Sequence, residues 1–376
     1  MKKIGKEVLF LSTSDSNPRN GEGSFIRLRD RSIMFVFTRY CGKSWYDHAS
    51  ASLFACCSTD EGESWSEPTV IVENDTDSLN IMSVSLLRLQ NGEIGLLYLK
   101  KFQTNEGIVC MPTFRRSSDE GKSWSEPMYC TDEIGYYIIN NDRLIQLKSG
   151  RIAAPVAYHG NAMTKLGAGA VRFLYSDDNG HSWTLTEIKI RSPFSDKTGC
   201  QEPGLFELDD GRLWTYFRTA YGHQYQSFSS DGGETWSLPA PNLHFTSPDS
   251  PMLVKRAGDY VLAIFNPIGY SCINELVEDW NSPKRTPYVC AVSKNGGISF
   301  DTGDRTSANG ELSDFAKNCV LLEDDKRSSY CYPAVIETTD GFLVAYYHSN
   351  RSRVCLNCTK ITAVTFRELE DALTHE

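Results

Sequence analysis

Six polar side chains stand nine residues before six hairpin turns, and three of them are carboxylates. The turns are centred on Arg31, Gly92, Gly150, Gly211, Gly258 and Gly341, and the polar residues before them are Glu22, Ser83, Asn141, Glu202, Asp249 and Tyr332. Carboxylates gathered at one site could hydrolyse a glycosidic bond, and their separation distinguishes inverting from retaining outcomes. The alternative interpretation is that these strands simply begin in polar loop ends.

The elements that carry this column are hairpins of an apolar strand, a turn and a second apolar strand. They span Phe25 to Tyr40, Leu86 to Tyr98, Leu144 to Tyr158, Leu205 to Arg218, Met252 to Asn266 and Ala334 to Tyr347. Six repeats of about 60 residues fill nearly the whole chain of 376 and leave no room for a second domain. We therefore expect an all-β fold in one domain, residues 1–376, built as a six-bladed β-propeller of four-stranded antiparallel blades. The polar column would then ring one mouth of the central channel.

A turn motif also recurs, five times, once after each of the first five hairpins. Its copies are Ser58 to Trp65, Ser117 to Trp124, Ser176 to Trp183, Ser229 to Trp236 and the divergent Ser293 to Phe300. Aspartate and serine side chains can bond turn amides, glycine accepts positive φ, and the final aromatic ring can pin the turn to its sheet. The motif's acidic residues are therefore predicted to be structural rather than catalytic.

The chain ends and the cysteines complete the outline. We expect Val8 to Leu11 to pair with the last strand, Ile361 to Phe366, and a short helix to follow at Leu369 to Leu373. The apolar run Val8 to Leu11 is too short for a signal-peptide core. Most of the twelve cysteines lie in apolar runs, which predicts reduced thiols. A cytoplasmic location is therefore expected, and an exported mature form is the alternative. The lone CxxC, Cys355 and Cys358, has no second pair or nearby histidine, which favours strand packing over zinc.

Charge and hydropathy exclude two classes of partner. The chain has 38 Lys and Arg against 48 Asp and Glu, a net charge of -10, and no basic block. Nucleic acid and anionic membranes are therefore not expected as partners. No apolar run approaches the roughly 18 residues that span a bilayer. If the substrate is anionic, the positive field must be local.

Taken together, these residues resemble the sialidase superfamily along the whole chain. Its members are six-bladed propellers that carry the Ser-x-Asp-x-Gly-x-Thr-Trp turn known as the Asp box. The resemblance implies that Tyr332, in Tyr-Cys-Tyr-Pro, is the nucleophile and that Glu202, in Glu-Pro-Gly-Leu-Phe, is its base. It implies that Asp47, in the loop before Leu53 to Cys57, is the general acid and base; a capping or turn aspartate is the alternative. The roles are chemically consistent, because a tyrosine of pKa about 10 is a weak nucleophile until a carboxylate takes its proton.

The resemblance is incomplete at the arginines that hold the substrate carboxylate in sialidases. Arg218 matches one of the three, and Arg285 matches another, with an exposed loop arginine as its alternative. Where the family carries Arg-Ile-Pro, this chain reads Gly-Glu22-Gly-Ser, so a negative charge stands where a carboxylate would bind. The remaining candidates for substrate binding are Arg19, Arg39, Asn141, Asp142 and Asp249.

Three functions follow as hypotheses. The leading one is an exo-acting retaining glycoside hydrolase that removes a terminal sialic or related acidic sugar from a glycan and needs no metal or organic cofactor. The second is a glycosidase or lyase of the same fold that acts on a non-sialic sugar, with Glu22, Glu202 and Asp249 as working carboxylates. The third is a propeller that binds glycans or proteins without turnover.

Overall fold

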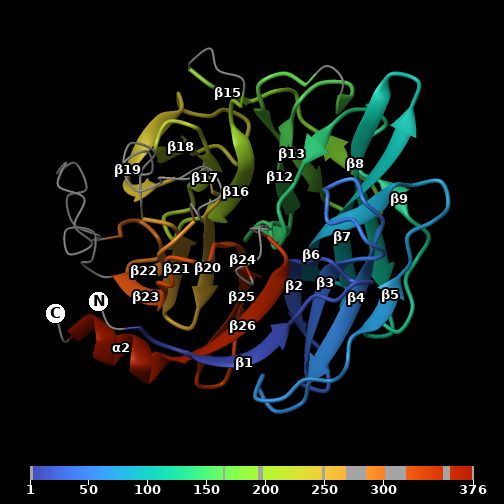
Figure 1. Cartoon of the computed structure of the whole chain (residues 1–376). Helices are drawn as coiled ribbons and strands as arrows, with labels where there is room; N and C mark the ends of the chain where they lie inside the picture. Colours follow the sequence, from blue (N-terminus) through green and yellow to red (C-terminus); the bar gives the residue numbers. More distant parts are fainter. Residues whose placement is uncertain are drawn as a thin grey trace. The chain divides into compact units, whose positions relative to one another are not determined.

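The computed structural model describes residues 3–163, 166–193, 198–247, 250–267, 285–300, 319–349 and 356–374. They form six antiparallel sheets and one helix, which confirms the predicted all-β class and the six-bladed β-propeller. The chain divides into two compact units: an N-terminal unit, Ser12–Leu205, and a C-terminal unit, Met1–Leu11 with Phe206–Glu376. Figure 1 shows the sheets coloured along the chain. The single domain over residues 1–376 stays a prediction.

The N-terminal unit begins with two regular four-stranded sheets whose strands are ordered as in the sequence. The first consists of β2 (Asn20–Arg27), β3 (Ile33–Tyr40), β4 (Ala51–Ser58) and β5 (Thr69–Val72). The second consists of β6 (Asn80–Arg88), β7 (Ile94–Thr104), β8 (Gly107–Ser117) and β9 (Met128–Tyr129). Strands β2 and β6 lie next to each other, and a buried core that includes Met34, Val36, Leu86 and Leu96 joins the two sheets.

The third sheet departs from the four-strand plan because its first and last strands are each split. Its members are β10 (Tyr137–Ile138), β11 (Ile145–Gln146), β12 (Ile152–Tyr158), β13 (Ala170–Ser176), β14 (Thr184–Leu185) and β15 (Ile190–Arg191). Both β10 and β11 pair with β12, and both β14 and β15 pair with β13. The four strand positions of a blade are therefore kept, and the gap between β10 and β11 becomes part of the candidate site.

Three further sheets complete the set. They consist of β16 (Gln201–Glu207), β17 (Leu213–Arg218), β18 (His223–Ser229) and β19 (Ala240–Thr246); of β20 (Leu253–Ala257), β21 (Tyr260–Phe265), β22 (Tyr288–Ser293) and β23 (Cys319–Glu323); and of β24 (Tyr330–Glu337), β25 (Gly341–His348), β26 (Cys358–Thr365) and β1 (Lys6–Leu11). All six predicted hairpins are thereby confirmed.

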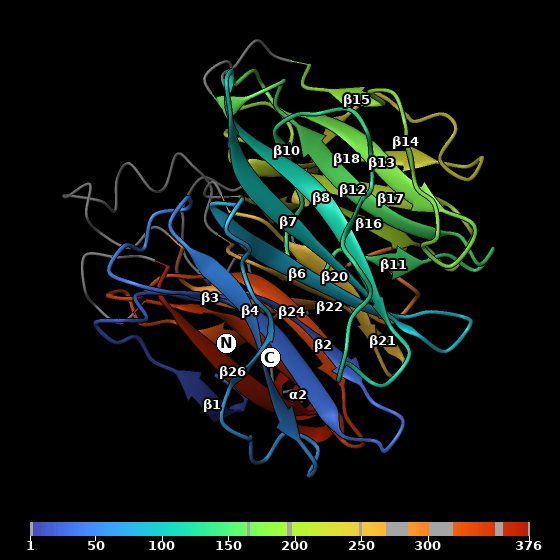
Figure 2. The same cartoon turned by 90° about the vertical axis from the view of Figure 1, so that its right-hand side faces the viewer.

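The N-terminal strand closes the last sheet, as predicted. Strand β1 pairs with β26, beside which it lies in Figure 2. Glu323, which is buried, accepts hydrogen bonds from Lys3 Nζ at 2.6 Å and Lys360 Nζ at 2.6 Å, so its charge is compensated and the segment before β1 is tied down. The predicted helix is also present as α2 (Phe366–Thr374).

Two general properties follow from the described residues. No helix among them is long and apolar enough to cross a membrane. None of the ten cysteines within them forms a disulfide, and eight are buried, as the sequence predicted. Cys358 of the CxxC pair is buried in β26, and Cys355 lies outside the described residues.

The Asp boxes are structural turns, as their composition predicted. In the first box, Asp60 Oδ1 accepts hydrogen bonds from Ser58 Oγ at 2.8 Å and from the Ser64 amide at 2.9 Å. Trp65 Nε1 donates to the carbonyl of Gly62 at 3.0 Å, which fixes the ring over the turn. The serine and backbone donors hold the pKa of Asp60 at about 2, because they stabilise its charged form. The two bonds to the aspartate recur at Asp119, Asp178 and Asp231.

The boxes predict acid-sensitive stability. A carboxyl group whose folded-state pKa is about 2, below its ordinary 3.8, stabilises the fold fully above its ordinary pKa and loses that contribution as the pH falls toward 2. We expect the melting temperature, followed by circular dichroism, to fall by several degrees between pH 4 and pH 2. The fifth box supplies the control, because Asn295 Oδ1 makes the same bonds to Ser293 and Ser299 without a titratable group. Asp119→Asn should therefore shrink the fall, and an unchanged fall would exclude this box as a contributor.

Candidate active site

A shared backbone strain marks the predicted polar column. Glu22, Ser83, Glu202 and Tyr332 all have φ between 47° and 62°, in the left-handed region that non-glycine residues rarely adopt. The strand register shifts at this position in β2, β6 and β24, so a bulge redirects each side chain. Residues held in such conformations cluster at functional sites.

The column differs from the prediction in the third blade, and one member is not described. There the strained residue is Asp142, with φ 57°, rather than Asn141. The offset arises because the first strand is interrupted between β10 and β11, so counting back from the turn no longer follows a continuous ladder. Asp249 lies outside the described residues.

Within the N-terminal unit, the first strands of three blades converge. The Ser83 hydroxyl donates to Glu22 Oε2, and the Ser24 hydroxyl donates to Asp142 Oδ1 at 2.9 Å. Asn141 Nδ2 donates to the carbonyl of Gly23 at 2.8 Å. The polar residues of these blades therefore meet one another and are more than solvated loop ends.

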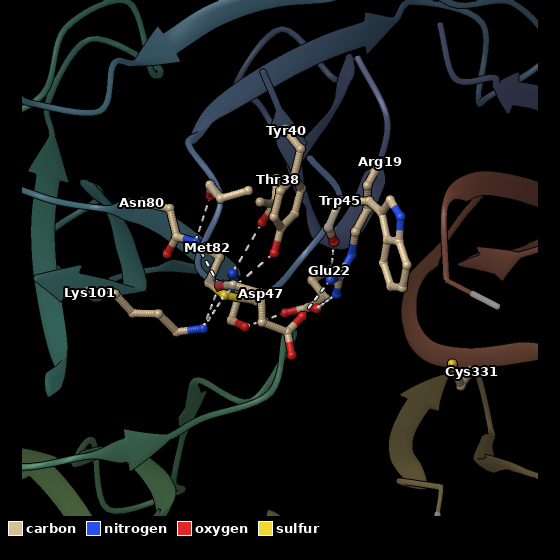
Figure 3. A network of polar contacts seen from close by, with 12 residues as sticks. Arg19, Glu22, Thr38, Tyr40, Trp45, Asp47, Asn80, Met82, Lys101 and Cys331 are labelled. Carbon is tan, nitrogen blue, oxygen red and sulfur yellow. Dashed lines mark hydrogen bonds and ion pairs between the residues drawn. The ribbon is translucent and has the colours of Figure 1, made fainter. Parts of the chain in front are cut away.

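Arg19 links Glu22 of this group to the loop that carries Asp47. Its Nη2 donates to Glu22 Oε1 at 2.8 Å, and its Nη1 donates to Asp47 Oδ1 at 2.5 Å and to the carbonyl of Trp45 at 3.4 Å. The guanidinium also lies over the ring of Tyr40, 4.7 Å from its centroid. Arg19 and Glu22 are only 4% and 6% exposed, whereas the Asp47 side chain is 63% exposed. Figure 3 shows Arg19, Glu22 and Asp47 beside one another. Asp47 is thus the member of the cluster that a substrate can reach.

The two carboxylates of this cluster have opposite electrostatic environments. Burial raises the pKa of Glu22, and the opposing effects of Arg19 and of the Ser83 hydroxyl do not cancel that rise. The protein around Asp47 displaces part of its water, which acts to raise its pKa although the side chain is exposed. The charges of Arg19 and Lys101 outweigh this desolvation and hold that pKa below its usual value. In this arrangement Asp47 is ionised at neutral pH.

Tyr332 and Arg285 are neighbours in the C-terminal unit. The Arg285 guanidinium carbon lies 5.5 Å from the centroid of the Tyr332 ring, and Nη1 is 3.1 Å from Cys331 Sγ. The edge of Tyr347 meets the Tyr332 ring at a centroid distance of 5.7 Å. Tyr332 and Arg285 are both half-buried, and so is Arg218, which ends β17. A cation thus stands beside the tyrosine that sequence analysis proposed as nucleophile.

Two candidates remain, Glu202 and Arg39. Glu202, in β16, is 7% exposed. Arg39 packs over the ring of Phe54 at 4.9 Å, and as the neighbour of Tyr40 along β3 it points to the opposite face of the sheet from the ring that meets Arg19. Among the described residues, no group of three or more His, Cys, Asp or Glu side chains could hold a metal ion.

Two residues of this site, Asn80 and Lys101, were not predicted from the sequence. Both donate hydrogen bonds to the main-chain carbonyl of Asp47. The sequence pattern of β7 does point to Lys101. Side chains at every second position of a strand share one face, and Lys101 lies on the same face as the buried Leu97 and Leu99. A lysine at such a position is unusual, because a buried ammonium group requires partners.

Comparisons with known proteins agree with this fold. A family model described as a BNR repeat-like domain matches residues 46–345. The chain is 31% identical over 162 residues to an anhydrosialidase of Macrobdella decora, covering 39% of this chain and 20% of that protein. It is 25% identical over 236 residues to a sialidase of Paraclostridium sordellii, covering 56% of this chain and 55% of that protein. The chain thus spans a fifth and about half of these two relatives.

Solved structures show the same fold at low identity. One is an intramolecular trans-sialidase from Ruminococcus gnavus in complex with oseltamivir carboxylate, with a TM-score of 0.70, 16% identity, and coverage of 97% of this chain and 98% of that one. Another is a protein of unknown function from Dyadobacter fermentans, with a TM-score of 0.69, 19% identity, and coverage of 96% and 99%. At these identities the likeness concerns the fold, and function has to be argued from the site.

Proposed function

Because the chain belongs to the BNR repeat-like domain family, and its homologues include sialidases, we propose that it is an exo-acting retaining glycoside hydrolase that removes a terminal sialic or related acidic sugar from a glycan. One observation supports this most strongly. Glu202 and Tyr332, the base and nucleophile implied by the sialidase resemblance, share the strained backbone of the polar column, and Tyr332 has a cation beside it.

The proposed reaction has two steps. In the first, the Tyr332 hydroxyl oxygen bonds to the anomeric carbon while Glu202 accepts its proton, the glycosidic bond breaks, and Asp47 gives its proton to the leaving oxygen. In the second, Asp47 takes a proton from water, the water oxygen bonds to the anomeric carbon, and the bond to Tyr332 breaks as the tyrosine recovers its proton. Arg218 and Arg285 hold the substrate carboxylate through charge-assisted hydrogen bonds.

The first step requires Asp47 to be protonated, whereas Arg19 and Lys101 hold its pKa low in the free protein. Substrate binding must therefore loosen the contact between Asp47 and Arg19, or cover Asp47 so that desolvation raises its pKa. The exposed position of the Asp47 carboxylate makes it accessible to such cover.

A second candidate is a glycosidase of this fold that acts on a non-sialic sugar. The observation that favours it is that Arg19 already forms ion pairs with Glu22 and Asp47. A substrate carboxylate at that place would meet two carboxylates and one buried guanidinium, which opposes its binding. If a sialic acid binds, Arg218 and Arg285 have to supply its cations.

The experiment is a panel of umbelliferyl glycosides that contains a sialoside beside neutral and uronic sugars. Release of umbelliferone from the sialoside supports the first candidate. Release only from another sugar supports the second, and silence throughout, together with measurable glycan binding, would replace both with a binding propeller. Since two similar proteins are called an anhydrosialidase and an intramolecular trans-sialidase, the mass of the released sugar should also be measured; a product lighter by one water would indicate intramolecular transfer.

A further inference from the structure

The loop that carries Asp47 is anchored from the neighbouring sheet. This acid loop, residues 41–50, connects β3 to β4, yet its main chain is held by side chains of β6 and β7. Asn80 Nδ2 donates to the carbonyls of Asp47 at 2.8 Å and Ala49 at 2.9 Å, and Lys101 Nζ donates to the carbonyl of Asp47 at 2.9 Å. Figure 3 shows both donors approaching Asp47 from the side opposite Arg19.

The two donors form a matched pair in the second sheet. Asn80 and Lys101 are directly opposite each other in the antiparallel ladder of β6 and β7. Asn80 is fully buried and Lys101 is 4% exposed. Met82, the next residue on the same face of β6, completes the surroundings of the ammonium group with its sulfur 3.1 Å from Nζ.

A packing role alone does not account for this lysine. Burying an ammonium group costs free energy unless hydrogen bonds and opposite charges compensate it, and an apolar side chain would fill the same space at a lower cost. The partners of Lys101 are a main-chain carbonyl and a thioether, neither of which carries a charge. Its compensation comes from the nearby carboxylates of Asp47 and Glu22, whose titration its charge influences. Lys100, the preceding residue, instead meets the exposed Asp75 at 2.5 Å.

We propose that Asn80 and Lys101 are positioning residues for the acid loop: together they fix the main chain of Asp47, and Lys101 additionally places a positive charge near its carboxylate. This inference rests on the proposed role of Asp47 as general acid and base. Asn80 acts by geometry alone, and Lys101 acts by geometry and by charge. The two contributions can therefore be separated by substitution.

Several other charged or titratable groups surround Asp47 and must stay constant in the test. They are Arg19 before β2, Glu22 in β2, Tyr40 in β3, His48 in the loop itself, Cys110 in β8 and Tyr136 before β10. Substituting Asn80 or Lys101 replaces none of these side chains. Because the Lys101 charge also acts on Glu22, His48 and Cys110, the titration of Asp47 in Lys101→Met is compared with that in Lys101→Arg, which keeps the charge.

The test compares Lys101→Met, Asn80→Ala and the control Lys100→Met in the full chain, with hydrogen–deuterium exchange of residues 41–50 as the first readout. Both test variants should exchange faster in this loop, and the control should not. On the glycoside that the panel identifies, kcat should fall by about 10- to 100-fold in both, with little change in KM, because misplacing a catalytic group costs this much. Unchanged exchange in both variants would overturn the positioning role.

The pH profile separates charge from geometry. Turnover by a general acid is lost as the pH rises through the pKa of that acid, so loss of the ammonium charge should move the basic limb of kcat/KM to higher pH. Lys101→Met should show this shift, whereas Asn80→Ala and Lys101→Arg, which keep the charge, should not. If the basic limb of kcat/KM lies at the same pH in all variants, the electrostatic part of the proposal is wrong.

The test is independent of whether the proposed function holds. If the wild-type chain releases no umbelliferone from any glycoside, the proposed function fails, while loop exchange and the titration of the Asp47 carboxyl by NMR still decide the positioning and the charge effect. If Lys101→Met does not fold, hydrogen–deuterium exchange of residues 41–50 is measured in Lys101→Arg and Asn80→Ala. Wild-type exchange in Asn80→Ala would then contradict the proposal that Asn80 and Lys101 together anchor the acid loop.

Discussion

Tyr332→Phe should fold like the wild-type chain and lose at least about 100-fold in turnover, since the proposed first step needs its hydroxyl oxygen. Phenylalanine keeps the ring that packs beside Arg285 and against the edge of Tyr347, so only the oxygen is removed. Turnover is measured as umbelliferone release from the glycoside that the panel identifies, and folding by circular dichroism and melting temperature. The expected fall lies in kcat as well as in kcat/KM.

The matched control is Tyr330→Phe, two residues earlier in β24. Tyr330 is fully buried and packs against Tyr346, so the control removes a hydroxyl group from the same strand without touching the proposed chemistry. It should retain wild-type turnover. Full turnover in Tyr332→Phe would show that the nucleophile lies elsewhere and would move the mechanism toward a carboxylate pair.

The fold was predictable because its periodic elements are local. Each Asp box places its hydrogen-bonding residues within eight positions, and each hairpin needs only two apolar runs and a turn. Neither signal depends on contacts between blades. Closure of the last sheet by β1 followed from the count of strands, since the final hairpin and β26 leave one strand position empty.

The third blade shows where such counting stops. The prediction assumed an unbroken first strand, but residues between β10 and β11 direct their amides to the second blade. The amide of Asp142 donates to the carbonyl of Val84 at 2.9 Å, and the amide of Arg143 donates to Ser85 Oγ at 2.8 Å. Tertiary contacts therefore replaced the ladder, and the strained position moved by one residue. No local pattern encodes that choice.

The cluster around Arg19 was only partly visible for the same reason. Arg19 and Glu22 are three residues apart, so their pairing is a local feature that the sequence could suggest. The contacts with Asp47 join segments 28 or more residues apart, and the acceptor for Asn80 and Lys101 is a main-chain carbonyl, which every residue has. Side-chain identity cannot reveal such a partner.

Asp47→Asn gives the second large expected effect, and this effect depends on the leaving group. Asparagine keeps the size of the side chain and an oxygen for Arg19, but it neither donates an acidic proton nor accepts one from water. With a natural sugar as leaving group, turnover should fall by at least about 100-fold, as when a catalytic acid is lost. Umbelliferone is a better leaving group than a sugar hydroxyl, so the first step should lose much less with the umbelliferyl substrate.

These unequal losses predict a distinctive time course. Because the second step still needs Asp47 to activate water, Asp47→Asn should release umbelliferone in a rapid burst of about one equivalent per enzyme, followed by slow steady turnover. A small external nucleophile that needs no base, such as azide, should speed the slow phase. Asp75→Asn is the control, since Asp75 is also an exposed carboxylate paired with a cation, Lys100, and this variant should show no burst. Equal loss with both leaving groups and no burst would show that Asp47 holds the loop in place rather than exchanging protons with the substrate.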